Sequence, residues 1–293
     1  MEHCFRPRRS VLYVPGCNQY YLERARTISA DAVILDLGDP ILIAAKIESR
    51  GNVVASVKQG GYGAREVIVR VNNLDSMWGA DDIKAVANIG ADAILLPNIE
   101  SAANVNTALK LLDDAGGKHM PIMVMIESPI AVLNAKKIAA ASDRIICMMM
   151  ATSDLTSQLH ARVTHEQSAI LTALSLVILA ARAYGRCVVD GITSDFKNMH
   201  SFEYACRMGR DMGFDGKTLV SPSQIAYSND AYTPKNGEVA HAREIIRALK
   251  EANEKGLGTV VVNDRLVEHH HVKAAERLLK LHNMIADLEE EYV

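Results

Sequence analysis

The chain has 293 residues, of which 49% are hydrophobic and 23% are charged, and its formal net charge is −3. This length and balance are typical of one α/β barrel with a substantial core. The sequence offers no basic stripe that would neutralise phosphates, so we expect no nucleic-acid partner. No apolar run approaches the roughly 18 residues of a membrane helix, so we expect no membrane partner.

The five cysteines are scattered along the chain and form no CxxC pair: Cys4, Cys17, Cys147, Cys187 and Cys206. An odd number at such spacings favours reduced thiols over a disulfide framework or a zinc site. We therefore expect a cytoplasmic protein.

Short runs rich in Val, Ile, Leu and Met alternate with stretches of helical periodicity. Continuous apolar runs of this kind are typical of strands buried on both faces, as in parallel sheets. The predicted strands are Ser10–Gly16, Asp31–Asp39, Glu66–Asn72, Asp92–Ile99, Pro121–Ser128, Ile145–Met150, Cys187–Ile192 and Gly216–Pro222. The predicted helices include Tyr20–Ser29, Met77–Asn88, Ser101–Ala115, Ile130–Ala141, Glu166–Tyr184 and Ser201–Met212. A count of eight strands favours a TIM (β/α)₈ barrel over an open doubly wound sheet.

Beyond the eighth strand the chain continues for longer than a barrel needs to close. A turn-rich connection leads to a long helix at about Glu238–Lys255, a short strand at Thr259–Val262 and a final helix at about Val272–Glu290. We predict a barrel domain over residues 1–228 and a C-terminal helical extension over residues 229–293. The extension is interpreted as a lid, an arm that contacts a neighbouring subunit, or extra packing.

Polar residues recur where the predicted strands end, which is where TIM barrels carry their active sites. These residues are Asp36, Asp39, Arg70, Asn72, Asn98, Glu100, Glu127, Ser128, Ser153, Asp154, Asp190 and Ser221. Glu127 and Asp154 follow adjacent strands and offer only oxygen ligands, which suits Mg²⁺. The alternative is a pair of rim acids held in ion pairs.

Arg70 ends its predicted strand at the barrel mouth, where a guanidinium is costly unless it meets an anion. Its partner is expected to be a substrate carboxylate or enolate oxygen, an internal acid such as Asp36 or Asp39, or both.

A basic cluster, Arg6, Arg8 and Arg9, precedes the first strand, which ends in Pro15-Gly16. Arginines beside a tight backbone turn are candidates for binding the phosphates of a nucleotide-bearing substrate. The alternative is a solvated basic N-terminus.

A run of three histidines, His269-His270-His271, lies near the end of the chain. Three consecutive histidines in a helix or strand are not expected to converge on one metal ion. We interpret them as surface or subunit-contact residues.

Together these features resemble the citrate lyase β-subunit-like branch of the HpcH/HpaI aldolase family. The resemblance runs in order from about Arg8 to Ala275, nearly the whole chain. The segments that carry it are Arg9–Gly16, Ala32–Asp39, Val69–Asn72, Leu96–Ser101, Met125–Ser128, Ala151–Thr156, Asp190–Gly191, Gly213–Lys217 and Ser221–Ile225.

The resemblance implies a TIM barrel, a homotrimer whose C-terminal segment reaches a neighbour, and Mg²⁺-dependent carbon–carbon lyase chemistry. The implied substrates are citryl, malyl and citramalyl thioesters of coenzyme A or of an acyl carrier protein. Cleavage of such a 3-hydroxyacyl thioester gives a 2-keto acid and an acyl thioester. Mg²⁺ would favour bond cleavage, and Arg70 would stabilise the thioester enolate until an acid protonates it.

The resemblance also assigns roles to individual residues. Glu127 and Asp154 match the metal-binding acids of the family, and Arg70 matches its substrate arginine. Arg9 and Lys46 fall where the family contacts coenzyme A phosphates. Further substrate contacts are implied for four residues after the first and sixth strands: Pro15, Gly16, Thr152 and Ser153.

Glu268 matches a tail acid that some members of the family offer to the site of a neighbouring subunit. It therefore joins Arg70 as the second candidate catalytic residue.

Several positions depart from the pattern of the family. The chain has Gly38 in place of Glu, Asn98 in place of Lys, Ala151 in place of Gly, and Ser221 in place of His. It also reads Asn263-Asp264 where the family has Asp-Gly. The change at position 151 matters most, because a methyl group would crowd a backbone that approaches a substrate carboxylate.

Two alternatives stand beside a coenzyme A-dependent lyase. One is a catalytically impaired relative that still binds the thioester. The other is the lyase subunit of a citrate lyase complex that acts on an acyl-carrier-protein thioester.

Overall fold

The computed structural model describes residues 5–38, 41–193, 195, 197–254, 256, 258–263 and 265–291. Four residues named in the predictions lie outside these ranges: Cys4, Asp39, Lys255 and Asp264. The chain divides into two compact units, one ending at Tyr232 and the other beginning at Thr233.

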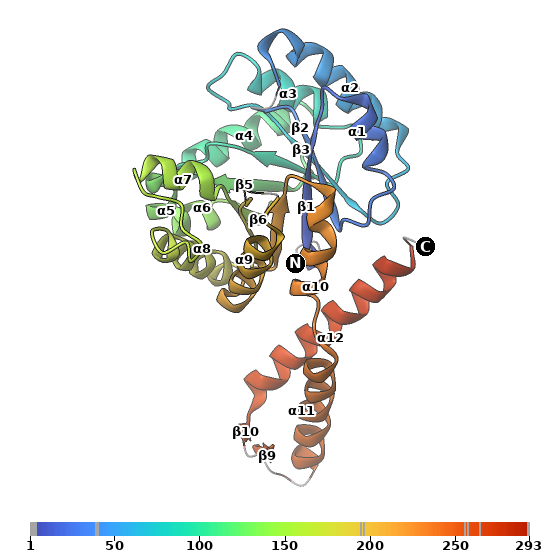
Figure 1. Cartoon of the computed structure of the whole chain (residues 1–293), viewed down its shortest axis with the longest axis vertical. Helices are drawn as coiled ribbons and strands as arrows, with labels where there is room; N and C mark the ends of the chain where they lie inside the picture. Colours follow the sequence, from blue (N-terminus) through green and yellow to red (C-terminus); the bar gives the residue numbers. More distant parts are fainter. Residues whose placement is uncertain are drawn as a thin grey trace. The chain divides into compact units, whose positions relative to one another are not determined.

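In the first unit eight parallel strands close into a barrel in chain order, with β8 returning to pair with β1 (Figure 1). The strands are β1 (Ser10–Pro15), β2 (Ala32–Asp36), β3 (Glu66–Arg70), β4 (Ala93–Leu96), β5 (Ile122–Ile126), β6 (Ile145–Met150), β7 (Cys187–Asp190) and β8 (Gly216–Leu219). Each lies within one of the eight predicted strands, and the predicted TIM barrel is confirmed.

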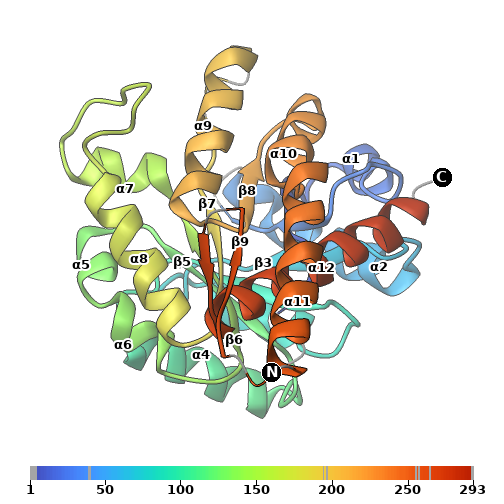
Figure 2. The same ribbon diagram turned by 90° about the horizontal axis from the view of Figure 1, so that it is seen from below.

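Helices lie outside the ring of strands, as a second view shows (Figure 2). They are α1 (Gln19–Arg24), α2 (Lys46–Gln59), α3 (Gly79–Val86), α4 (Ala102–Asp114), α5 (Pro129–Leu133), α6 (Ala135–Ala139), α7 (Thr152–Gln158), α8 (Leu171–Ala183), α9 (Met199–Met212) and α10 (Ile225–Tyr232), with short 3₁₀ turns η2 (Ile43–Ala45) and η3 (Pro222–Gln224). The predicted helices do not include α2, because Gly51 and many polar side chains weaken its apolar pattern. The helix predicted at Ile130–Ala141 is divided at Asn134 into α5 and α6.

Successive side chains of each strand point alternately into the barrel and toward the helices, so the strands contribute to two apolar layers. Ile34, Ile68 and Met123 belong to the cluster that fills the barrel. Their neighbours Val33 and Val69 belong to the larger cluster between the strands and the helices. Because the interior is packed with side chains, a ligand can enter only at the rim.

Local capping explains where several helices begin. The Ser128 side chain accepts a hydrogen bond from the Ala131 amide at 3.2 Å, and Pro129 opens α5. Both features are typical of a helix N-terminus. This cap turns the chain into a helix directly after Glu127, so that this acid stays at the strand end.

The second unit consists of two helices joined by a β-hairpin. Helices α11 (Asn236–Glu254) and α12 (His269–Glu290) contact each other, and antiparallel strands β9 (Val260–Val262) and β10 (Arg265–Val267) connect them. Leu249, Val262 and Val267 form a small buried core. Helix α12 begins three residues before the predicted start at Val272, so the histidine run lies in its first turn.

Within the described part of the chain, no helix combines the length and the apolar character that a membrane span requires.

Candidate active site

Strand register gathers charged side chains at the carboxyl end of the barrel. Pro15 of β1 pairs with Asp36 of β2, which in turn pairs with Arg70 of β3. Asp36 and Arg70 share the inward-facing parity of the residues that fill the barrel, and so does Glu127, directly after β5. The strand ends thus bring together residues that are far apart in the sequence.

The guanidinium of Arg70 lies between two carboxylates. Its Nη1 is 3.3 Å from Oδ2 of Asp36, and its Nη2 is 3.9 Å from Oε1 of Glu127. Its Cζ lies 6.0 Å from the centre of the Tyr13 ring. The expected internal salt bridge with Asp36 is therefore present, and it orients Arg70 at the mouth of the barrel.

Gly38 makes room for this arrangement. Its amide donates to Oδ1 of Asp36 at 2.7 Å. A Cβ atom at position 38 would lie 2.9 Å from the same oxygen and 3.0 Å from Nη1 of Arg70. A side chain here, such as the glutamate of the family pattern, would therefore have to move Arg70 from its present position.

Glu127 is buried and held by the neighbouring strand end. Its Oε2 accepts a hydrogen bond from the Asn98 amide at 2.8 Å. Asn98 has a φ of 53°, a left-handed conformation that Asn tolerates better than most residues. Asn98, which replaces the Lys of the family pattern, therefore suits the backbone turn at this position. That turn directs the Asn98 amide toward Glu127.

The first turn of α7 completes the rim. Asp154 and Ser153 are exposed there, whereas Thr152 is buried and its hydroxyl donates to the Ile192 carbonyl at 3.2 Å. Ala151 precedes the helix with a φ of −110°, which strains no side chain. Its amide donates to the Ile126 carbonyl at 3.0 Å, so β5 and β6 end at the same level.

A cavity of about 370 Å³ opens between these strand ends. Polar groups on its wall come from Tyr13, Asp36, Arg70, Ser153 and Asp154. The apolar part of the wall is formed by Met125, Met150, Ala151, Ile192 and Val220. A cavity with an arginine, two acids and an apolar wall suits an anionic ligand that also carries apolar groups.

Tyr13 is a site residue that the predicted set does not contain. Burial raises its pKa well above the ordinary value, the positive charge of Arg70 opposes this, and the negative charges of Asp36, Glu127 and Asp154 raise the pKa further. The phenol is therefore neutral across the physiological range. Its inward parity with Val11 on β1 is the sequence signal that would have found it.

Two arginines of the basic N-terminal cluster form buried ion pairs within the barrel. Arg9 is buried, and its Nη2 lies 2.8 Å from Oδ1 of Asp31. Arg8 is also buried, and its Nε lies 2.6 Å from Oε2 of Glu66. Both arginines precede β1 and therefore lie at the amino-terminal end of the barrel, opposite the cavity. The charge of Arg9 is thus paired with Asp31 inside the fold, and its contact with coenzyme A phosphates stays a prediction.

Lys46 and Gly16 are likewise engaged within the fold. Lys46 is buried, and its Nζ donates to the carbonyl oxygens of Leu37 at 2.8 Å and Gly38 at 2.7 Å and to Oδ1 of Asn72 at 2.6 Å. The Gly16 amide donates to the Asp36 carbonyl at 2.9 Å. These hydrogen bonds give Lys46 and the Gly16 amide a role in shaping the loops around Asp36, and their contact with substrate stays a prediction. Pro15 remains on the cavity wall.

Asp190 and Ser221 also form internal contacts. Asp190 is buried with Lys217 of β8, with 2.5 Å between Oδ2 and Nζ. The Ser221 side chain accepts from the Ser223 amide at 3.3 Å and begins η3. Neither residue lines the cavity beside Arg70.

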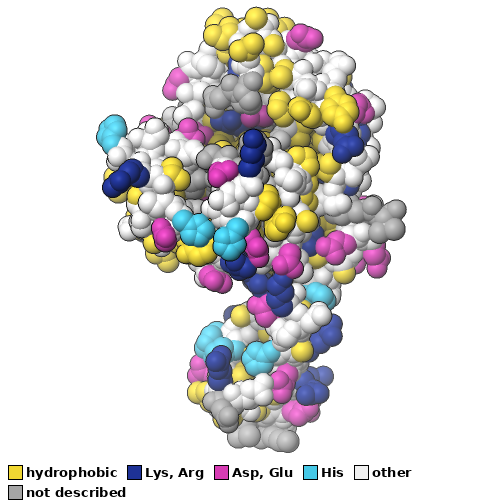
Figure 3. All heavy atoms as spheres, in the orientation of Figure 1, with side chains coloured by type: hydrophobic (Ala, Val, Ile, Leu, Met, Phe, Trp, Pro, Cys, Tyr) yellow, Lys and Arg dark blue, Asp and Glu magenta, His cyan; other side chains and the backbone are white. Residues whose placement is uncertain are grey.

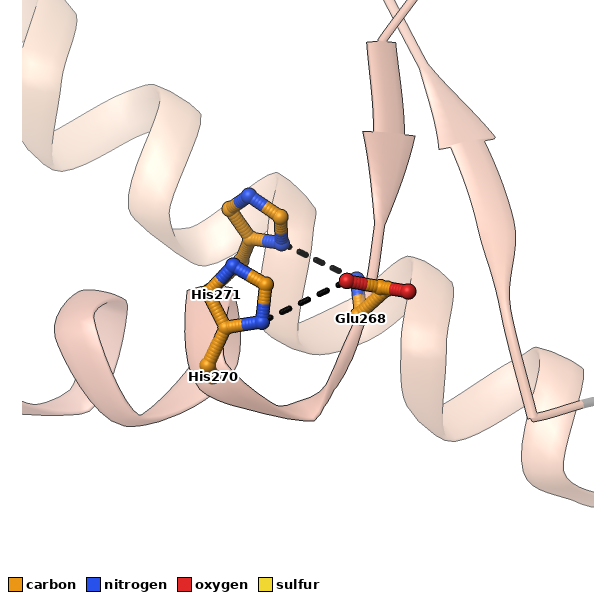
Figure 4. A group of neighbouring side chains, drawn as sticks. All are labelled: Glu268, His270 and His271. Atoms are coloured by element: carbon orange, nitrogen blue, oxygen red, sulfur yellow. Dashed lines mark hydrogen bonds and ion pairs between the residues drawn. The ribbon is translucent and has the colours of Figure 1, made fainter.

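Glu268, the predicted tail acid, belongs to the second unit. It is the N-cap of α12 and exposes its carboxylate. Oε2 lies 3.4 Å from Nδ1 of His270 (Figure 4). The carboxylate is thus accessible to another molecule.

Fold and site together define a TIM-barrel protein with an arginine between acids at the carboxyl-terminal rim, which is where barrel enzymes carry their active sites. The family model described as HpcH/HpaI aldolase/citrate lyase matches residues 9–222. The chain therefore belongs to the HpcH/HpaI aldolase/citrate lyase family, a family of enzymes.

Individual relatives agree with this membership. A (3S)-malyl-CoA thioesterase of Cereibacter sphaeroides is 40% identical over 286 residues, which cover 98% of each chain. The citrate lyase subunit beta of Leuconostoc mesenteroides subsp. cremoris is 34% identical and also covers 98% of each chain. Among solved structures, CitE from Mycobacterium tuberculosis in complex with magnesium, acetoacetate and coenzyme A has a TM-score of 0.76, with 25% identity. That match covers 96% of this chain and 99% of the other.

Proposed function

We propose that this protein is a Mg²⁺-dependent carbon–carbon lyase. Its substrate is a 3-hydroxyacyl thioester of coenzyme A of the citramalyl, malyl or citryl type, and its products are a 2-keto acid and an acyl-CoA. The observation that carries the proposal is the guanidinium of Arg70, held at the cavity between Asp36 and Glu127.

Glu127 and Asp154 are the proposed metal ligands. Both offer carboxylate oxygens, the donors that Mg²⁺ prefers, and a site with one or two protein carboxylates keeps positions for water and substrate. Ile126 and Met150 are partners in the sheet register, so both acids follow neighbouring strand ends. When bound, Mg²⁺ supplies Lewis-acid polarisation of the oxygens of the 2-keto acid fragment. The relative from Mycobacterium tuberculosis in complex with magnesium supports the use of Mg²⁺ as the metal.

Arg70 is the proposed anion-stabilising residue. Cleavage of the carbon–carbon bond leaves negative charge on the thioester enolate, and a preorganised guanidinium at the cavity wall stabilises that charge. Asp36 keeps the guanidinium in place. Neutral Tyr13 beside it contributes a hydroxyl and an aromatic wall.

Thr152, Ser153 and Glu268 complete the proposed machinery. Thr152 and Ser153 border the end of β6, where the carboxylate of the 2-keto acid fragment is expected to bind. Glu268 of a neighbouring subunit, in its carboxylic acid form, is proposed to donate its proton to the enolate carbon and to become a carboxylate. Its side chain is exposed on a unit separate from the barrel.

The proposed assembly is a homotrimer. Hydrophobic side chains gather on the molecular surface over α1 and α2 (Figure 3). Leu42 and Ile43 are 80% and 75% exposed, and Ile47 is 68% exposed. An exposed apolar patch of this kind supports a contact with another subunit. Light scattering of the purified protein tests the trimer, and a monomeric mass would contradict it.

Thioester hydrolysis is a second candidate, favoured by the relatives of 39–40% identity named (3S)-malyl-CoA thioesterase. The two activities give different products from one substrate. A lyase converts malyl-CoA to glyoxylate and acetyl-CoA, whereas a thioesterase releases malate and free coenzyme A.

The deciding experiment incubates the protein and Mg²⁺ with malyl-CoA and, separately, with citramalyl-CoA. The 2-keto acid is measured as a hydrazone, and the free thiol is measured in the same sample. We expect the 2-keto acid to form without free thiol. Free thiol alone would replace the lyase with a thioesterase. No product from either substrate would favour an impaired relative or, if an acyl-carrier-protein thioester is cleaved instead, a subunit of a citrate lyase complex.

A further inference from the structure

Three metal-ligating side chains meet at the start of α12, outside the site in the barrel (Figure 4). Glu268, His270 and His271 each offer one ligand atom, and these atoms lie within 4.8 Å of one another. In the part of the chain that the structure describes, no other group of three or more His, Cys, Asp and Glu ligands meets this criterion.

This arrangement differs from the expectation for the histidine run. Three consecutive histidines were not expected to converge on one ion, and His269 is indeed outside the group. The turn from β10 into α12 instead supplies Glu268 as the third member, beside His270 and His271.

The spacing within the group fits metal coordination. Zinc binds nitrogen and carboxylate oxygen at about 2.0–2.2 Å, so two ligands of a tetrahedral ion lie roughly 3.4 Å apart. Oε2 of Glu268 and Nδ1 of His270 are separated by 3.4 Å. Both side chains are exposed, at 47% and 68%, so an ion from solution can reach them.

The third ligand is held in place by the helix start. Nδ1 of His271 accepts a hydrogen bond from the Glu268 amide at 3.0 Å. Its ring lies against that of His270, with 3.8 Å between the ring centres and 37° between the planes. The two imidazoles are thereby kept on the same side of the helix start as the carboxylate. A metal ion would replace the backbone N–H as the partner of His271.

We propose that Glu268, His270 and His271 form a binding site for a divalent transition-metal ion of the Zn²⁺ class. Two imidazoles and one carboxylate are a ligand set that zinc uses in sites with an open fourth position. Imidazole also suits Ni²⁺, Cu²⁺ and Co²⁺, whereas Mg²⁺ prefers oxygen ligands only. The site is therefore chemically distinct from the Glu127 and Asp154 pair in the barrel.

Direct titration of the full-length chain without an affinity tag tests this site. Calorimetry with Zn²⁺ is performed in saturating Mg²⁺, so that the acids in the barrel are occupied. We expect one equivalent of Zn²⁺ per chain with micromolar affinity. With Co²⁺, we expect visible d–d absorption bands stronger than those of the aqueous ion, because a protein site with four or five ligands replaces the octahedral shell of water.

Variants of neighbouring histidines provide a matched control. The double variant His270→Ala/His271→Ala should weaken Zn²⁺ binding by about 100-fold, whereas His269→Ala should leave the affinity unchanged. Glu268→Gln keeps the size of the side chain and should weaken binding by about 10-fold, which tests the site even if the double variant unfolds. The proposal would be overturned if the original chain did not bind Zn²⁺. It would also be overturned if the double variant and Glu268→Gln bound Zn²⁺ as tightly as the original chain, or if His269→Ala weakened binding as much as the double variant.

Occupation of this site would withdraw Glu268 from the reaction, a consequence that rests on the proposed function. A carboxylate bound to Zn²⁺ cannot deliver a proton, so Zn²⁺ should lower turnover of the original chain at saturating Mg²⁺. The ratio of rates with and without Zn²⁺ should return to about one in the double variant. Zinc binding without inhibition would keep the metal site and remove Glu268 from the proposed reaction. These two failures are therefore distinguishable.

Discussion

Arg70 and Glu127 face each other at the carboxyl end of the barrel, with 3.9 Å between Nη2 and Oε1. This separation is longer than a hydrogen bond, so charge attraction acts between these two atoms. The shorter contact of Arg70 is to Asp36, at 3.3 Å. The arginine is thus shared between two strand ends, and its position depends on both acids.

Arg70→Lys should lower kcat/KM by about 100-fold, because a compact ammonium cannot reproduce the planar fork between two carboxylates. Arg50→Lys is the matched control, since Nε of Arg50 lies 2.6 Å from Oδ1 of Asp82 but Arg50 does not line the cavity. That variant should retain its activity. Steady-state kinetics on the same thioester measures both. Full activity of Arg70→Lys would reduce Arg70 to a structural ion pair.

Asp154→Ala should lower metal-dependent kcat/KM by at least about 100-fold while the fold stays intact. Asp154 is exposed in the first turn of α7, so its loss leaves no unpaired buried group. Mn²⁺ binding followed by electron paramagnetic resonance should weaken in parallel. Asp81→Ala, which removes an exposed acid on α3, serves as the control and should change neither signal. Unaltered Mn²⁺ affinity in Asp154→Ala would exclude the residue as a ligand.

Gly38→Ala should lower kcat/KM by roughly 10-fold to 100-fold, because its methyl group would press on Arg70 and Asp36. Gly51→Ala is the control. Nothing lies within 4 Å of a Cβ at position 51, which is inside α2, so this change should stabilise the protein by about 0.5–1 kcal/mol without affecting turnover. Kinetics and thermal unfolding distinguish the two. Equal kcat/KM of both variants would show that Arg70 can move away from the added methyl group without loss of activity.

Arg8→Met should reduce the free energy of unfolding by about 3–5 kcal/mol, because it leaves the buried carboxylate of Glu66 without its main partner. Arg207→Met removes an exposed partner of Glu203 on α9 and should cost less than about 1 kcal/mol. Urea unfolding of both variants measures the difference. Similar losses in the two variants would show that burial of the Arg8–Glu66 pair adds nothing to its effect on stability.

Asp215 should make the stability of the folded protein sensitive to acid. Burial raises its pKa, but hydrogen bonds from Arg182 and the Val188 amide outweigh burial, and the pKa lies below its ordinary value. For such a depressed pKa, the stabilisation is present above the unfolded-state value of about 3.9 and is lost as pH falls through the folded-state value. The stability advantage of the original chain over Asp215→Asn should therefore shrink as the pH falls below about 4. Urea midpoints across this range measure it, and a constant difference would exclude Asp215 as the source.

The barrel was predictable because its signal is local. Eight apolar runs mark strands buried on both faces, and the residue that ends each run must lie at the same rim whatever the packing. This reasoning placed Asp36, Arg70 and Glu127 correctly at one end of the barrel. The same parity argument extends to Tyr13, which the predicted set does not include.

The partners of the basic residues outside the cavity were not predictable, because Coulomb attraction and hydrogen bonding depend on distance in space. From the sequence, the basic cluster was a candidate phosphate site. In the structure Arg9 pairs with Asp31, 22 residues away, and Arg8 pairs with Glu66, 58 residues away. Lys46 likewise reaches Asn72 across 26 residues.

The sequence by itself determined the barrel and the rim that carries the polar residues, because periodicity and strand ends are properties of neighbouring residues. Only the tertiary structure decided which charged side chains form ion pairs inside the fold and which face the cavity. It also decided that a turn before α12 brings Glu268 to His270 and His271, since that meeting depends on backbone direction and not on residue type.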